Sequence, residues 1–151
     1  MENKNLAQKL LEIQSNVEGL TKQWHEGKLQ YPYVSSSQVL GVVRDKMNEL
    51  GLLLIPNIVS AQVHTSVGYG GKHHITELTI DFTWLDTTSG ETMTMRWYGQ
   101  GSDDAEKGVG KALTYAEKYL FLKLFHVPTD ADDPDAFQVV TEDVVSPRPA
   151  V

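Results

Sequence analysis

The sequence of 151 residues contains no cysteine. A chain without thiols forms neither a disulfide framework nor a thiolate metal site, and their absence suits a reducing compartment. The sequence also lacks any long apolar run, and its first ten residues are polar with charges of both signs. We therefore expect no membrane span and no signal peptide. With 40% hydrophobic and 9% aromatic residues, the composition is that of a globular domain with a core.

Basic residues are scarce too, since 13 Lys and Arg stand against 20 Asp and Glu, giving a net charge of −7. Such a chain has no general attraction for nucleic acid, so a polyanion would need a local basic patch. Residues 129–151 hold six of the acids and one base, a net charge of −5, which leaves −2 for residues 1–128. We predict a nearly neutral core domain over residues 1–128 and an acidic, poorly ordered tail over residues 129–151.

Apolar residues repeat at helical spacing in two N-terminal segments. Residues 4–20 predict an amphipathic helix, and a second helix follows a serine cap at residues 35–37 and ends at Gly51. Residues 52–66, 75–86 and 92–99 predict strands, separated by turns at residues 68–71 and 87–90. In the second strand we expect Ile75 on the apolar face together with Leu78, with one slip near Glu77.

A long third helix is expected after the strands, capped by Asp103 or Asp104 and followed by a turn at Pro128. The order of elements predicts an α+β fold, in which a three-stranded antiparallel sheet packs on this long helix. The core is thus a β-β-β-α unit with two preceding helices.

The long helix has two different faces. Lys107, Lys111 and Lys118 fall within about 40° of one another at 100° per residue, which makes a narrow basic stripe. Ala112 and Leu120 belong to an apolar face opposite the stripe. This arrangement suits a helix that packs its apolar face on a core and exposes its basic face to a polyanion. A simple solvated face would show the same pattern.

Other side chains near the stripe suit nucleic-acid binding. Arg96 and Tyr98 share one face of the last predicted strand, and Tyr115 flanks the stripe, whereas the periodicity predicts Trp97 and Tyr119 to be buried. Arginine binds phosphate, and tyrosine stacks on bases. The candidate DNA contacts are therefore Lys107, Lys111, Lys118, Arg96, Tyr98 and Tyr115.

Two segments resemble motifs of nucleotide-binding or metal-binding sites but lack residues that those motifs require. The segment Gly108–Lys111 resembles a phosphate-binding loop, but Ala105 and Ala112 stand where that motif requires glycine and Ser or Thr. Its glycines suit either close approach of a partner or tight packing of the helix on the sheet. The acids of Asp130–Asp135 lack the glycine and glutamate positions of a calcium loop.

Adjacent His73 and His74 would point to opposite sides of a strand, so a shared metal is not expected. We expect no enzyme, no cofactor and no bound metal.

Several segments of the chain resemble the Erf family of phage single-strand annealing proteins. They are Tyr31–Ser35, Met47–Leu52, Tyr98–Asp104, Lys107–Tyr119 and the exit Pro128–Asp135, so the resemblance covers about residues 1–135. The family is similar to the eukaryotic recombination mediator, whose core is a β-β-β-α unit. The resemblance implies rings or filaments that bind single-stranded DNA in a basic groove and anneal complementary strands without ATP.

By position, the resemblance places Lys107, Lys111 and Lys118 along that groove, with Arg96 and Tyr98 as its other wall. It also implies a phage-encoded protein that acts in the bacterial cytoplasm, away from membranes. Its partners would be single-stranded DNA, further copies of itself and a host single-stranded-DNA-binding protein. The alternatives are an oligomeric protein-interaction module without DNA binding and, more remotely, a metal-dependent nuclease that uses Asp130–Asp135.

Overall fold

The computed structural model describes residues 3–25 and 36–127 and confirms the predicted α+β fold. Its elements in chain order are α1 (Leu6–His25), α2 (Ser36–Leu50), β1 (Leu52–Gly68), β2 (Gly71–Asp86), β3 (Thr92–Asp103) and α3 (Gly108–Leu124). Ser35 of the predicted cap, the Tyr31–Ser35 segment and the predicted tail lie outside the described residues.

The three strands form an antiparallel sheet in the order β1-β2-β3. Gly70 and Gly71 adopt φ angles of 104° and 103° in the first turn, which explains why glycine stands there. Strand β3 continues to Asp103, past the predicted end at Gly99, because its last residues still pair with β2. A glycine-rich segment reads as a loop from composition alone, and only the pairing reveals the strand.

Strand β2 alternates strictly, and its buried side chains face the helices. Thr76, Leu78 and Ile80 are buried in turn, whereas Ile75 is only partly buried and lies on the other face. The prediction for Ile75 was therefore wrong. No slip occurs at Glu77, and Thr76 takes the inward position because Gly108 of α3 packs against it.

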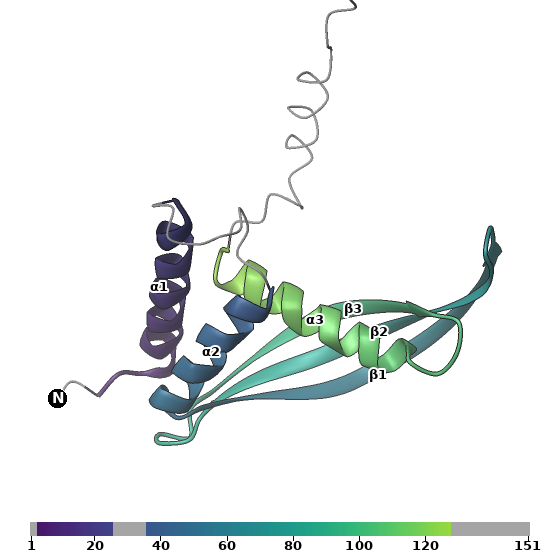
Figure 1. Cartoon of the computed structure of the whole chain (residues 1–151). Coiled ribbons are helices and arrows are strands. Elements are labelled where there is room, and N and C mark those ends of the chain that lie inside the picture. Colours follow the sequence, from purple (N-terminus) through teal and green to yellow (C-terminus); the bar gives the residue numbers. More distant parts are fainter. Residues whose placement is uncertain (1–2, 26–35, 128–151) are drawn as a thin grey trace, which may run out of the picture.

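All three helices lie on one face of the sheet (Figure 1). Helix α3 lies along the strands, while α1 and α2 gather at the end of the sheet where β1 begins. One core cluster joins α3 to β2, and a second joins all three helices to Trp84, which touches the rings of Phe121 and Phe125. Within the described part of the chain, the outward side of the first turns of α3 is exposed, whereas Phe121 and Leu122 in its last turns are buried in the cluster shared with α1 and α2.

Polar contacts fix α1 to the sheet. The Lys9 ammonium lies 2.9 Å from Asp86 Oδ2 at the end of β2 and donates to the Leu50 carbonyl at 3.0 Å. Asp86 is buried, and the hydrogen bond from Lys9 holds its pKa below the usual value. The backbone N–H of Leu6 donates to Glu91 in the β2–β3 turn. The first turn of α1 is thus attached to one end of the sheet.

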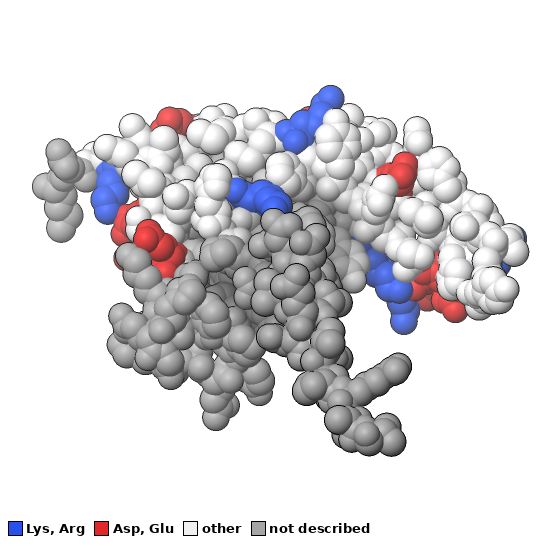
Figure 2. Space-filling model, turned by 90° about the horizontal axis from the view of Figure 1, so that it is seen from above, with Lys and Arg blue, Asp and Glu red and all other residues white. Residues whose placement is uncertain are grey.

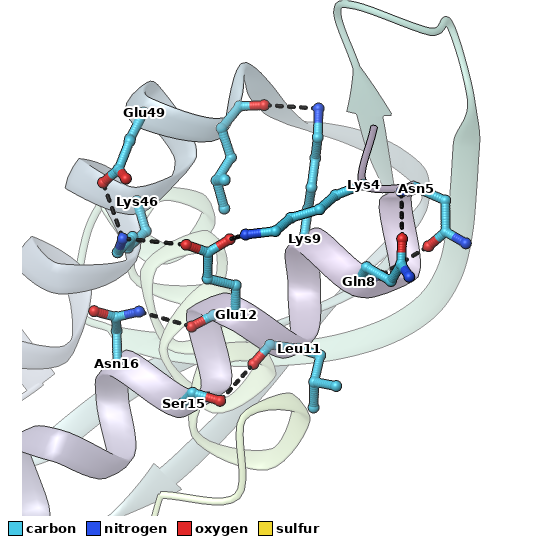
Figure 3. Close-up of polar contacts among 11 residues, drawn as sticks. Lys4, Asn5, Gln8, Lys9, Leu11, Glu12, Ser15, Asn16, Lys46 and Glu49 are labelled. Carbon is cyan, nitrogen blue, oxygen red and sulfur yellow. Dashed lines mark hydrogen bonds and ion pairs between the residues drawn. The ribbon is translucent and has the colours of Figure 1, made fainter. Parts of the chain in front are cut away.

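Helices α1 and α2 are joined by surface charges (Figure 3). Glu12 accepts from Lys4 at 2.7 Å and lies 3.5 Å from Lys46 of α2, and Lys46 also contacts Glu49. These pairs are partly exposed, so each contributes little to stability by itself.

Candidate nucleic-acid interface

Glycines on β3 let α3 lie unusually close to the sheet. A Cβ on Gly99 would overlap the carbonyl of Ala112 and come within 2.7 Å of the Ala116 Cβ, and one on Gly101 would lie 2.6 Å from the Ala112 nitrogen. Gly108 packs on Thr76 in the same way, which favours the packing role for this glycine. The close contact fixes the rotation of α3 about its axis and so fixes which side chains face outward.

Gly110 is different from the other glycines of this segment. A Cβ there would meet nothing within 4 Å, although Gly110 lies in the first turn of α3. Packing within the described part of the chain does not require this glycine, so the partner-approach role of the motif stays open for Gly110.

Asp103 organises the loop that leads into α3. The helix begins at Gly108, so the predicted cap at Asp103 or Asp104 was wrong. Instead, Asp103 is the last residue of β3. Its carboxylate accepts hydrogen bonds from the backbone N–H groups of Ala105 and Lys107 and from the Lys111 ammonium. With Lys111 as the largest cause, these donors lower the pKa of Asp103 to about 2.

Lys111 is held by this loop. Its ammonium lies 2.5 Å from Asp103 Oδ1 and donates to the Ser102 carbonyl at 3.1 Å. The Asp103 carboxylate raises the pKa of Lys111, which therefore stays protonated. The charge of Lys111 is compensated internally, although the side chain remains half-exposed.

Lys107 is exposed just before α3, and Lys118 is partly buried where α3 faces α2. Neither ammonium forms an ion pair with another residue in the part of the chain that is described. The Lys118 Nζ lies 5.9 Å and 5.4 Å from the ring centroids of Tyr115 and Tyr119, within cation–π range.

The tyrosines of α3 are both exposed. Tyr119 is 38% exposed, so the prediction that it is buried was wrong. It lies about 120° from Lys107 around the helix, at the border between the basic stripe and the apolar face. Tyr115 is exposed on the same side as Lys107 and Lys111, and these three residues line one shallow depression of about 580 Å³.

Arg96 and Tyr98 lie on the opposite face of the sheet. Trp97 is partly buried and packs toward α3, so its two neighbours on β3 point away from the helix. The structure therefore places Lys107 directly before α3, and Lys111, Lys118 and Tyr115 on the same side of that helix. It does not place Arg96 and Tyr98 beside them as the other wall of one groove within a single chain.

On that open face, Arg96 is paired with Asp81. Its guanidinium donates to both carboxylate oxygens, at 3.0 Å and 3.1 Å, and lowers the pKa of Asp81. Tyr98 is 68% exposed and borders a depression of about 380 Å³. The depression is also lined by Ser60, Gln62, Glu77, Leu78, Thr79, Gly99 and Gln100.

The charges around α3 cancel. Residues 103–124 contain four acids and four lysines, a net charge of zero. On the face shown in Figure 2, Lys and Arg side chains form separate spots, some of them directly beside Asp or Glu side chains. The described part of a single chain therefore offers a few uncompensated lysines and not a continuous basic groove.

A cavity between α2 and α3 was not foreseen from the sequence. It measures about 190 Å³ and is lined mainly by apolar groups of Val39, Leu40, Phe121 and Leu122, with Ser37, Thr114, Glu117 and Lys118 beside them. Burial raises the pKa of the Glu117 carboxyl. Periodicity assigns these residues to helices, but only the packing of one helix on the other creates the space.

The described residues hold no group of three or more His, Asp or Glu side chains that could bind a metal ion. The Asp130–Asp135 segment lies outside them. Among the described helices, none is long and apolar enough to span a bilayer.

A sequence model of the ERF superfamily matches residues 6–144, which includes every described helix and strand. Searches among curated proteins and among solved structures found no match.

Proposed function

We propose that the chain, which belongs to the ERF superfamily of phage recombination proteins, binds single-stranded DNA and anneals complementary strands without ATP. The observation that carries the proposal is the outward face of α3, where Lys107 and Lys118 have no acidic partner among the described residues and Tyr115 is exposed between them. Lysines bind phosphates, and exposed tyrosines stack on bases without regard to sequence.

Lys111 has a supporting part in this proposal. Its ion pair with Asp103 fixes the loop before α3, and the same carboxylate holds the backbone of Lys107. A phosphate that reached Lys111 would have to compete with this carboxylate. Lys107 and Lys118 are therefore the main phosphate contacts, and Lys111 keeps the start of the helix in place.

Annealing follows from how such a site holds DNA. Contacts to phosphate leave the base edges free, so a bound strand remains available for pairing with a second strand. No step in this process requires nucleotide hydrolysis. The protein acts in this scheme by neutralising phosphates and by keeping strands extended.

A homo-oligomer would supply the DNA affinity that one chain lacks. The net charge of zero around α3 gives a weak site, and a homo-oligomer in a ring or filament would place many such sites along one strand. In the same proposal, residues 1–128 form the annealing domain and residues 129–151 form an acidic tail. A phage-encoded protein of this kind acts in the bacterial cytoplasm, with a host single-stranded-DNA-binding protein as a further partner.

A protein-interaction module without DNA binding is the second candidate. It is favoured by the compensated charges of Lys111 and Arg96 and by the net charge of −7. In that case the lysines of α3 would be solvated and would have no ligand.

Binding of a fluorescent single-stranded oligonucleotide separates the two candidates. We expect affinity to fall steeply with salt, and the double variant Lys107→Gln/Lys118→Gln to bind at least tenfold more weakly. The slope of log K against log salt should fall by about 1.4 for each engaged subunit, because about 0.7 is lost per phosphate contact. The control Lys4→Gln/Lys72→Gln changes the net charge equally and should bind as the wild type does. Equal weakening in both double variants, or no binding by the wild type, would contradict the assignment.

A further inference from the structure

The cavity between α2 and α3 has apolar walls that are open to water. It measures about 190 Å³, and Val39, Leu40, Phe121 and Leu122 supply most of its lining. Leu40 is 44% exposed, so part of this lining contacts solvent. A concave apolar surface of this kind favours an apolar occupant, and an apolar cavity of about 150 Å³ is large enough for a benzene ring. The cavity can therefore hold one phenyl side chain.

The chain leaves the described residues beside this cavity. Val127 is the last of them, and its backbone N–H donates to the Leu122 carbonyl at 2.9 Å. Val127 is also buried in the core cluster that contains Phe121 and Leu122, the two residues of α3 that form the cavity wall. The segment that follows Val127 therefore starts next to the cavity.

This segment combines an aromatic residue with a run of acids. Phe137 is the one aromatic residue of the sequence after Phe125, and four aspartates precede it at positions 130, 132, 133 and 135. Phe137 comes ten residues after Val127, and ten extended residues span about 30 Å. The side chain of Phe137 is thus within reach of a cavity whose wall includes Leu122.

The charges at the margin of the cavity favour an acidic segment on one side. Lys118 lies at this margin and forms no ion pair with another described residue. Glu117 also borders the cavity, so acids bound here have to lie on the Lys118 side. Residues 26–35, which precede α2, contain one acid and one base and offer Lys118 no net charge.

We infer that Phe137 binds in the cavity between α2 and α3 of its own chain, and that the aspartates before it contact Lys118. Attachment through Val127 gives the segment a high effective concentration at the cavity, so weak contacts are enough to hold it. One consequence rests on the proposed function, in which Lys118 is a phosphate contact. The bound segment would then compete with DNA for Lys118 and restrain DNA binding.

Disulfide formation in the full chain, without DNA, tests the contact. Since the chain has no cysteine, the Leu40→Cys/Phe137→Cys variant carries a single pair of thiols. The matched control is Val109→Cys/Phe137→Cys, because Val109 of α3 is also 44% exposed but does not line the cavity. Under mild oxidation of dilute protein, we expect the Leu40→Cys pair to close within one chain at least about tenfold faster than the control.

High salt should slow the closure of the Leu40→Cys pair, because it screens the attraction between the aspartates and Lys118. Equal rates for the two pairs would refute the contact. A disulfide that forms between two chains, seen as a dimer on a non-reducing gel, would overturn the assignment to the same chain.

DNA affinity tests the competition separately. Phe137→Ala changes no charge, and we expect it to raise the affinity for a single-stranded oligonucleotide at least about twofold, because the aspartates lose their anchor. The control Leu11→Ala on α1, where Leu11 is 60% exposed, should bind as the wild type does. An unchanged or lower affinity of Phe137→Ala would overturn the competition.

The contact and the proposed function fail separately. Rapid closure of the Leu40→Cys/Phe137→Cys pair in a protein that never binds DNA would support the contact and refute the DNA function. Salt-sensitive DNA binding, together with equal closure rates of the two pairs, would refute the contact and leave the DNA function in place.

Discussion

Asp103 shows how one carboxylate can set the geometry of a surface. It accepts hydrogen bonds from two backbone N–H groups of the loop and from Lys111, and so ties the end of β3 to the first turns of α3. These contacts all favour its charged form, which explains the pKa of about 2. The position of Lys107 at the start of α3 depends on this one side chain.

The pH dependence of stability tests the role of Asp103. Its pKa in the folded chain, about 2, lies below the unfolded value of about 3.9. The charged carboxylate therefore stabilises the fold above the unfolded value, and this contribution is lost as the pH falls toward 2. We expect Asp103→Asn to have a lower Tm than the wild type at pH 6, with the difference shrinking between pH 4 and pH 2. Thermal unfolding followed by circular dichroism measures it, and a difference independent of pH would contradict the assignment.

Substitution by glutamine should mainly lower the stability at Lys111 and mainly weaken DNA binding at Lys107. Lys111→Gln removes the ion pair with Asp103 and should lower the Tm, whereas Lys107→Gln should leave the Tm within about 1 °C of the wild type because its side chain is exposed. In DNA binding, Lys107→Gln should have the larger effect once both variants are compared well below their Tm. If Lys107→Gln lowers the Tm as much as Lys111→Gln does, the division of roles is wrong.

At the scale of elements, the contact between α3 and the sheet depends on glycine. Gly99→Ala would drive a methyl group into the Ala112 carbonyl and should destabilise the fold by about 1–3 kcal/mol. Gly110→Ala should stabilise it by up to about 1 kcal/mol, since alanine favours the helix and open space surrounds the position. Urea unfolding of the two variants gives both values. Similar signs for the two substitutions would show that the close packing is not as described.

The attachment of α1 provides a second pair of variants. Lys9→Met leaves the buried Asp86 carboxylate without its cation, whereas Lys4→Met removes only a partly exposed contact to Glu12. We expect the Tm loss of Lys9→Met to be several times that of Lys4→Met, in thermal unfolding at neutral pH. Equal losses would mean that the Lys9–Asp86 pair does not hold α1 on the sheet.

The sequence predicted these elements well because each depends on local periodicity. The two N-terminal helices, the three strands and the long helix are all present, and the apolar face of α3 is the predicted one. The wrong predictions concern the start of a helix and the border between two helix faces. The start of α3 was misplaced because Asp103 satisfies loop donors, and Tyr119 was misplaced because it lies where two helix faces meet.

At the scale of the whole molecule, the candidate site could be only partly predicted. Helical spacing placed Lys107, Lys111, Lys118 and Tyr115 on one side of α3, and the structure agrees. Spacing could not show that Lys111 is neutralised by Asp103, or that the sheet separates Arg96 and Tyr98 from the lysines. Both facts depend on contacts between elements, which no single-segment pattern contains.

The charge balance then explains why the whole assembly matters. The chain carries −7, and the region around α3 is neutral, so one copy should bind DNA weakly and several copies together should bind it well. DNA affinity should therefore rise with oligonucleotide length until the strand spans the sites of the oligomer. Anisotropy with a series of oligonucleotides measures this, and an affinity independent of length would indicate that single chains act alone.

The most direct measurement is the annealing of two complementary fluorescent oligonucleotides, without nucleotide or metal, at low and at high salt. The account predicts that the wild type accelerates annealing at low salt, that salt suppresses the effect and that Lys107→Gln/Lys118→Gln abolishes it. The control Lys4→Gln/Lys72→Gln should anneal at the wild-type rate. A folded, oligomeric wild type that does not accelerate annealing would contradict the account and favour the protein-interaction module.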